Sequence, residues 1–316
     1  MTAVSSTCDP TPSVLRLPAS VAWKRSALGL TIGRGIDAVS RWLLVVLLAR
    51  WTSIADLGAW AIATAIAAPV FTLLELRLRW LAAAGGVTGA NARHYWLVRG
   101  ATVAVAMVGV GAAWPFLGDR YLASLLVMVF AAKSVELFSE LAKGLAQYRD
   151  RPAAVAVGSG LRGIMGVVGA MVGLHYEASA LAAVSGLTLA WAAVFLLWDL
   201  PVVGLPQGPL RFRPGWRTSW SIVMMATPVA IASVLTGLGR ILPRWALALW
   251  HPRDLVGIFT ALAALAAAGD IFVSSMAHAA IAPLGRLATR DFRRHRRIVW
   301  ELVGTAALLG LVGTTV

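Results

Sequence analysis

The chain has 316 residues, of which 59% are hydrophobic and only 13% are charged, and its mean hydropathy is +0.77. A soluble domain carries about a quarter charged residues, so this composition excludes an ordinary water-soluble enzyme and predicts a membrane protein. The net charge of +14 comes from basic clusters between apolar runs, which is typical of cytoplasmic membrane loops and not of a nucleic-acid-binding surface.

The first 25 residues contain several prolines and no apolar run of signal-peptide length, which predicts a disordered cytoplasmic tail over 1–25. A membrane-spanning helix needs about 20 apolar residues, and nine later runs meet or approach that length. The chain is therefore expected to be an all-α polytopic membrane protein with about nine transmembrane helices. The runs are Ala27–Ala49, Leu57–Leu76, Gly100–Leu117, Tyr121–Ala142, Ala153–Leu174, Ala178–Trp198, Thr218–Leu242, Leu255–Ala282 and Ile298–Val316.

The connections between these runs alternate in basic content. Three arginines, Arg50, Arg120 and Arg253, lie in one set of connections. Because basic loops stay in the cytoplasm, the other set and the N-terminus are predicted to be cytoplasmic. That set holds nineteen basic residues: Arg16, Lys24, Arg25, Arg77, Arg79, Arg93, Arg99, Lys143, Arg149, Arg151, Arg211, Arg213, Arg217, Arg286, Arg290, Arg293, Arg294, Arg296 and Arg297.

A proline-rich polar stretch divides the chain. Residues 201–217 are predicted to be a cytoplasmic linker between a six-helix lobe, 26–200, and a partial second lobe of three helices, 218–316. A shift of 199 residues supports a repeat, because it relates Arg41 to Arg240, Trp51 to Trp250, Gly58 to Gly257 and Trp60 to Phe259. The last apolar run is short, so we expect the second lobe to be incomplete and the chain to be truncated.

Three segments carry a family resemblance: "RGIDAVSRWLLVVLLARWTSIADLGAWAIATAIAAPVFTLLELRLR", "KSVELFSELAKGLAQYRDRPAAVAVGSGLRG" and "IAPLGRLATRDFRRHRRIVWELV". Together they resemble the bacterial polysaccharide repeat-unit (O-antigen and exopolysaccharide) flippases of the multidrug/oligosaccharidyl-lipid/polysaccharide exporter superfamily. The resemblance implies two six-helix lobes around a central cavity in the bacterial inner membrane. It also implies export of a polyprenyl-diphosphate-linked oligosaccharide, with a polysaccharide polymerase and glycosyltransferases as expected partners.

Ionisable residues inside the apolar runs are the candidate site, because charge at bilayer depth usually faces a bundle interior or a water-filled cavity. Arg34, Asp37 and Arg41 share one face of the first helix. They are expected to form a cationic cavity wall, with a self-neutralising ion pair as the alternative. Lys133 and Glu136 share a face of the fourth helix with Glu140 and Lys143, as part of a cavity or of an ion-pair ladder.

Four further residues extend this predicted substrate-binding cavity. Arg162 lies in mid-span without a local acid, so it completes a phosphate site or pairs with Glu136. Arg240 and Arg244 match the first-helix arginines in the repeat, although side chains near the interface also snorkel. Asp270 divides the eighth run and is expected to be buried. Glu75 and Arg79, by contrast, read as a pair at a helix end.

No pattern in the sequence predicts an enzyme, a metal or a cofactor. The run Gly158–Gly163 spells a dinucleotide fingerprint, but it lies in an apolar helix and no strand precedes it. The histidines are scattered and Cys8 is the single cysteine. The alternatives to a polysaccharide flippase are a multidrug or lipid II exporter, or a truncated, non-transporting membrane component of polysaccharide assembly.

Overall fold

The computed structural model describes residues 20–83, 91–149, 151–203 and 215–263, together with positions 296, 300, 303 and 304. Within this part the secondary structure is entirely helical, which confirms the predicted all-α polytopic class. The α-helices are α1 (Ser20–Trp51), α2 (Ile54–Leu74), α3 (Leu78–Ala83), α4 (Ala92–Ala113), α5 (Arg120–Tyr148), α6 (Pro152–Tyr176), α7 (Ala180–Val194), α8 (Leu200–Val203) and α9 (Trp216–Trp250).

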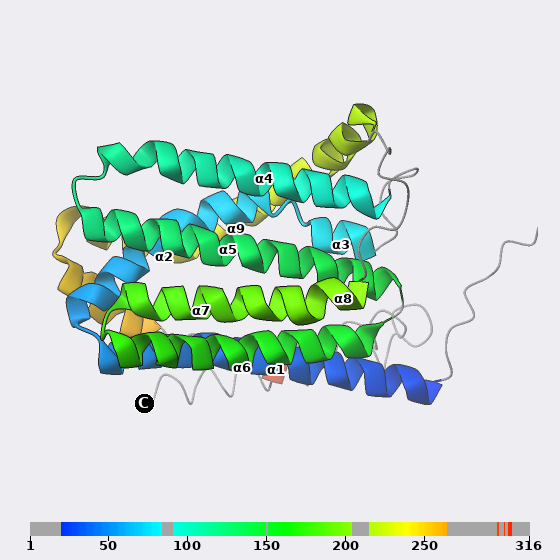
Figure 1. The fold of residues 1–316 in the computed structure, drawn as a ribbon, viewed down its shortest axis with the longest axis horizontal. Helices are drawn as coiled ribbons and strands as arrows, with labels where there is room; N and C mark the ends of the chain where they lie inside the picture. Colours follow the sequence, from blue (N-terminus) through cyan, green and yellow to red (C-terminus); the bar gives the residue numbers. More distant parts are fainter. Residues whose placement is uncertain are drawn as a thin grey trace, which may run out of the picture.

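Six helical stretches in the described part are long and apolar enough to cross a membrane. They are Ile54–Ala83, Ala92–Phe116, Arg120–Tyr148, Pro152–Tyr176, Ala180–Val202 and Trp216–Gly239. Helix α1 has 32 residues but carries three charges in its middle. It packs along α6 in the same bundle, and it begins at Ser20, inside the predicted tail (Figure 1). Of the last two predicted spans, residues 255–263 of the eighth and positions 300, 303 and 304 of the ninth are described, and all of them are helical.

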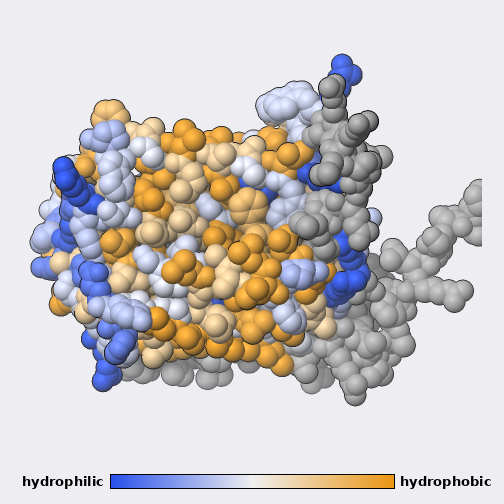
Figure 2. Space-filling view, in the orientation of Figure 1, coloured by the Kyte–Doolittle hydropathy of each residue, from blue (hydrophilic) through white to orange (hydrophobic). Residues whose placement is uncertain are grey.

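Successive long helices run in opposite directions, so their connections collect at the two ends of the bundle (Figure 1). The connections α1–α2, α4–α5 and α6–α7 lie at one end, and the connection α5–α6 lies at the other. Apolar side chains cover the middle of the visible face. Hydrophilic side chains gather at the end that holds the connections α1–α2, α4–α5 and α6–α7 (Figure 2). This distribution fits a bilayer around the middle of the bundle.

The helices α6 and α7 approach closely through glycines. An added Cβ on Gly169 would lie 2.4 Å from the Gly186 carbonyl oxygen, and one on Gly173 would lie 2.1 Å from the Ala182 carbonyl oxygen. Small residues allow such backbone contact between membrane helices. The close packing places α7 beside the charged face of α6.

Helix α7 does not end where the sixth span was predicted to end. It continues through a π-turn, Phe195–Asp199, into α8, which reaches Val203. A π-turn inserts an extra residue and re-aims the side chains that follow. As a result Asp199 lies inside the bundle at 4% exposure, and residues 201–203 of the predicted linker are helical instead. Residues 204–214 of the predicted linker lie outside the described part.

The seventh predicted span is α9, which packs against α2 and α4. Trp245 donates its indole N–H to the Ala65 carbonyl at 3.2 Å. The segment that follows α9 contacts α2 through two glycines, one on each segment. A Cβ on Gly58 would lie 2.0 Å from the Arg253 carbonyl oxygen, and one on Gly257 would lie 2.4 Å from that of Ile54.

The 199-residue shift relates these two contacts to one another. It relates Ile54 to Arg253 and Gly58 to Gly257, so that each contact corresponds to the other. Reciprocity of this kind is the signature of an approximate two-fold axis. The geometry therefore supports the sequence repeat between the second and eighth spans. The division into two lobes stays a prediction.

Candidate functional site

Charged side chains from four helices meet inside the bundle as one ion-paired network. Its carboxylates are Asp37 on α1 and Glu136 and Glu140 on α5. Its ion-paired cations outnumber them by two within the described part, and the nearby Asp199 carboxylate, which interacts electrostatically with Lys143 and Arg162, reduces this excess to one. An unbalanced buried charge requires a counter-ion or water. The five cations are Arg41 on α1, Arg79 on α3, Lys133 and Lys143 on α5 and Arg162 on α6.

Arg162 is the centre of the network and is only 2% exposed. Its Nη2 lies 3.1 Å from Asp37 Oδ2 and its Nη1 lies 2.9 Å from Glu140 Oε1. Arg162 therefore forms ion pairs across the bundle, but with Asp37 and Glu140 instead of Glu136. Its part in a phosphate site stays a prediction. The close packing of α6 on α1 brings Arg162 to Asp37.

The remaining contacts join the predicted clusters. Arg41 lies 3.2 Å from Asp37 and also pairs with Glu136, and Lys133 lies 2.8 Å from Glu136. Lys143 lies 3.3 Å from Glu140. The predicted ladder on α5 thus exists, and Arg41 connects it to the predicted wall on α1. Arg34, the third member of that wall, instead stacks on Trp80.

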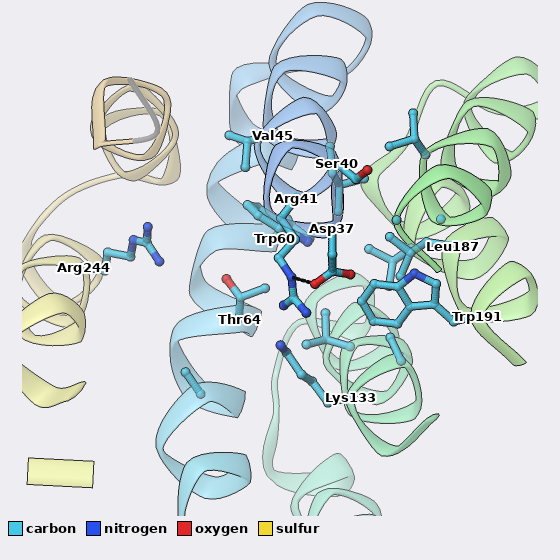
Figure 3. A pocket seen from close by; sticks show the side chains of 18 residues that line it. Asp37, Ser40, Arg41, Val45, Trp60, Thr64, Lys133, Leu187, Trp191 and Arg244 are labelled. Atoms are coloured by element: carbon cyan, nitrogen blue, oxygen red, sulfur yellow. Dashed lines mark hydrogen bonds and ion pairs between the residues drawn. The ribbon is translucent and has the colours of Figure 1, made fainter. Parts of the chain in front are cut away.

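A cavity of about 310 Å³ opens beside the network, within the size range of small-molecule sites. Asp37, Arg41 and Lys133 form its polar wall, and Figure 3 shows their charged groups turned toward one another. Leu187 and Trp191 of α7 face them as part of an apolar wall. The remaining lining residues are Ser40, Leu44, Val45, Trp60, Thr64, Ala68, Val129, Ala132, Gly163, Gly166, Val167, Val184 and Arg244.

Arg244 is the part of the cavity contributed by α9, and it lies apart from the other charged groups (Figure 3). It is half-buried, and its Nε finds no hydrogen-bond partner among the described residues. This position places one cation of the predicted second lobe opposite Arg41 and Lys133. The side chain of Arg240 and the whole of Asp270 lie outside the described part, so their roles stay predictions.

Two arginines that the sequence assigned to a cytoplasmic loop are buried in helices, which corrects that assignment. Arg79 on α3 pairs with Glu140, and not with Glu75 as expected. Arg99 on α4 is fully buried and donates to the carbonyls of Leu74 and Glu75. The expected Glu75–Arg79 pair fails because the chain bends between these residues, with positive φ at Leu76 and Arg77.

Asp199 is a further buried acid that sequence reasoning missed. Ser139 of α5 donates a hydrogen bond to it, and Gly158 leaves room for it, because a Cβ there would lie 2.7 Å from Asp199 Oδ1. The sequence signal that could have found it is its position, directly after the apolar run that ends at Trp198. Within the described residues, no three His, Cys, Asp or Glu side chains are grouped to hold a metal ion.

No protein-family model matches this chain, and no curated protein sequence matches it. Among solved structures, it is similar to a crystal structure of a MATE in the straight conformation. The TM-score is 0.52 and the identity is 14%, over 92% of this chain and 70% of that chain. At this identity the likeness concerns the fold. The polysaccharide-flippase resemblance, including its superfamily, therefore stays a prediction. The chain shares its helical fold with that MATE structure over 92% of its length.

Proposed function

We propose that this protein moves a polyprenyl-diphosphate-linked oligosaccharide across the bacterial inner membrane, with its N-terminus in the cytoplasm. The transporter fold supports membrane transport in general. The observation that carries the finer proposal is the cavity wall of Arg41 and Lys133, beside a network whose cations outnumber its carboxylates even when Asp199 is included. A diphosphate supplies the missing negative charge at this depth.

The shape of the cavity fits an amphipathic anion better than a free ion. Apolar side chains of α7 lie across from the cations, and Arg244 approaches from α9. Arginine binds phosphate through a planar fork of N–H donors and stays charged at any relevant pH. Asp37 and Glu136 already occupy part of the Arg41 guanidinium, so they compete with the substrate and favour its release.

The test is a flipping assay with purified protein in liposomes that contain a fluorescent polyprenyl-diphosphate oligosaccharide, bleached from outside with dithionite. We expect Arg41→Ala to slow flipping by at least about tenfold, because one charge-assisted contact is lost. Arg41→Lys should recover part of the rate if charge matters and little if the guanidinium fork does. Arg50→Ala, at the exposed end of the same helix, is the matched control and should flip normally. Wild-type flipping by Arg41→Ala would contradict the proposal.

A related multidrug exporter is the second candidate, favoured by Trp60 and Trp191 in the cavity wall. A cationic drug would meet the excess positive charge, so we expect ethidium to be transported poorly by the same liposomes. Ethidium transport without lipid flipping would favour the drug exporter. Absence of both activities would favour the non-transporting component of polysaccharide assembly, acting with a polymerase or glycosyltransferase.

A further inference from the structure

The connection between α2 and α3 is a bend in a strained backbone conformation. Leu76 and Arg77 have φ values of 49° and 47°, which side chains other than glycine rarely adopt. Such strain costs about 1–3 kcal/mol per residue, persists only where the surroundings hold it, and clusters at functional sites. The bend turns α3 back onto α5.

Two contacts hold this bend in place. Arg99 of α4 donates from Nη1 to the Leu74 carbonyl at 3.1 Å and from Nη2 to the Glu75 carbonyl at 2.9 Å. On the other side, the α3 backbone lies against Gly144 of α5, where a Cβ would be 2.6 Å from the Arg79 carbonyl oxygen. The position of α3 is therefore set from both sides.

In this position the Arg79 guanidinium is buried, and not all of its N–H groups have an acceptor. Its Nη1 pairs with Glu140, but its Nε and Nη2 are buried and have no acceptor among the described residues. The Arg79 side chain is only 10% exposed. A buried N–H without an acceptor costs about 1–3 kcal/mol, and more when the group is charged, so these two donors point to a ligand or water.

A second arginine shares the same aromatic ring. The Arg34 Cζ lies 5.7 Å from the centroid of the Trp80 indole, and the Arg79 Cζ lies 5.8 Å from it. Within the described ranges, Arg34 makes no ion pair with a carboxylate. Two guanidinium groups around one indole leave positive charge that Glu140 alone does not balance.

We propose that Arg34, Arg79 and Trp80 form a second phosphate-binding subsite, separate from the cavity at Arg41. Arg34 precedes Arg41 by seven residues, or about 10 Å along α1, on the side of the predicted cytoplasmic end. The partly exposed Arg34 fork binds phosphate oxygens, and the Arg79 side chain turns toward the bound anion so that its buried Nε and Nη2 gain an acceptor. Its role as the place where the diphosphate is captured before it reaches Arg41 rests on the proposed function, but its anion binding does not.

The experiment is a calorimetric titration of the full chain with inorganic pyrophosphate, in nanodiscs of phosphatidylcholine. We expect two binding events in the wild type. Arg34→Gln should weaken one of them by about tenfold, the loss of one charged contact, and Arg79→Gln should do the same. Because Arg79→Gln can disturb folding, Arg34→Gln is the decisive variant. Arg50→Gln, at the far end of α1, is the matched control and should keep both events.

A second variant distinguishes the subsite at Arg34 from the cavity at Arg41. Arg41→Gln should remove the other event and leave the Arg34-dependent event in place, so failure of the proposed function is distinguishable from failure of the subsite. Nanodiscs containing phosphatidylglycerol distinguish a lipid headgroup from free phosphate, since headgroup occupancy would abolish the Arg34-dependent event there and free-phosphate binding would preserve it. A single binding event that Arg34→Gln leaves unchanged would overturn the inference.

Discussion

The pair Ser139 and Asp199 shows what a buried polar group needs in this bundle. Ser139 is 1% exposed and Asp199 is 4% exposed, and the serine hydroxyl donates to the carboxylate. Without that donor, a carboxylate among apolar helices loses part of its solvation. The same need explains Glu140, which has Arg79, Lys143 and Arg162 around it.

We predict that Ser139→Ala lowers the free energy of unfolding by about 1–3 kcal/mol, because it leaves the buried carboxylate without its donor. Thermal unfolding in detergent measures the effect. Ser185→Ala is the matched control. Its hydroxyl donates to the Leu181 carbonyl of the same helix, so its loss should cost less than about 0.5 kcal/mol. Equal stability of Ser139→Ala and wild type would show that the hydrogen bond contributes nothing.

At the scale of elements, the contact between α6 and α7 depends on the absence of side chains. Gly169 and Gly186 face one another, and a Cβ on Gly186 would lie 2.0 Å from the Gly169 carbonyl oxygen. The contact supports Trp191, which donates its indole N–H to the Arg162 carbonyl at 3.2 Å and forms part of the cavity wall. Helix packing therefore sets the cavity as well as the core.

We predict that Gly169→Ala destabilises the protein by about 1–3 kcal/mol, because the added methyl group forces the two backbones apart. Gly109→Ala on α4 is the control, since a Cβ there meets nothing within 4 Å. That control should be neutral or stabilising by up to about 1 kcal/mol, because alanine favours a helix more than glycine does. Unfolding temperatures of the two variants that do not differ would refute the close contact.

At the scale of the whole molecule, an ion pair ties the segment after α9 to the α4–α5 connection. Arg253 donates to Asp119, and both side chains are 38% exposed. The hydrogen bond from Arg253, with help from the Leu122 backbone N–H, holds the pKa of Asp119 below its usual value. The pair lies at the bundle end where Gly58 meets Arg253.

This lowered pKa has a pH signature. The stabilisation is fully present above the unfolded pKa of about 3.9 and is lost as pH falls through the lower folded value. We predict that Asp119→Asn lowers the unfolding temperature by a constant amount between about pH 5 and about pH 8. The difference should shrink below about pH 4. Arg253→Gln should behave alike, and the double variant should add nothing. A difference that grows on acidification would contradict this account.

The orientation of the bundle is the last prediction. Because most basic residues of the connections are predicted on one side of the membrane, cysteine at Ala178 should react with an impermeant maleimide from the periplasm. Cysteine at Tyr148 should react only after permeabilisation. Both positions are exposed: Ala178 lies in the α6–α7 connection, and Tyr148 is the last residue of α5, at the opposite end of the bundle. Cys8 is first replaced by serine. Labelling of Tyr148→Cys in intact cells, without labelling at Ala178, would reverse the topology.

The sequence by itself determined the class of this protein and the helices that carry charge. Apolar runs of span length follow from the thickness of the bilayer, and spacings of three and four residues put Asp37 and Arg41 on one face. Both are local properties, readable along one helix. The repeat was readable too, because it pairs Gly58 with Gly257.

Only the tertiary structure decided the partners of each charge. Arg162 meets Asp37 across 125 positions of sequence because α6 packs on α1. Arg79 meets Glu140 because the strained bend at Leu76 turns α3 onto α5. A π-turn brings Asp199 into the bundle. Pairing between distant helices depends on their crossing and rotation, which the pattern within one helix does not contain.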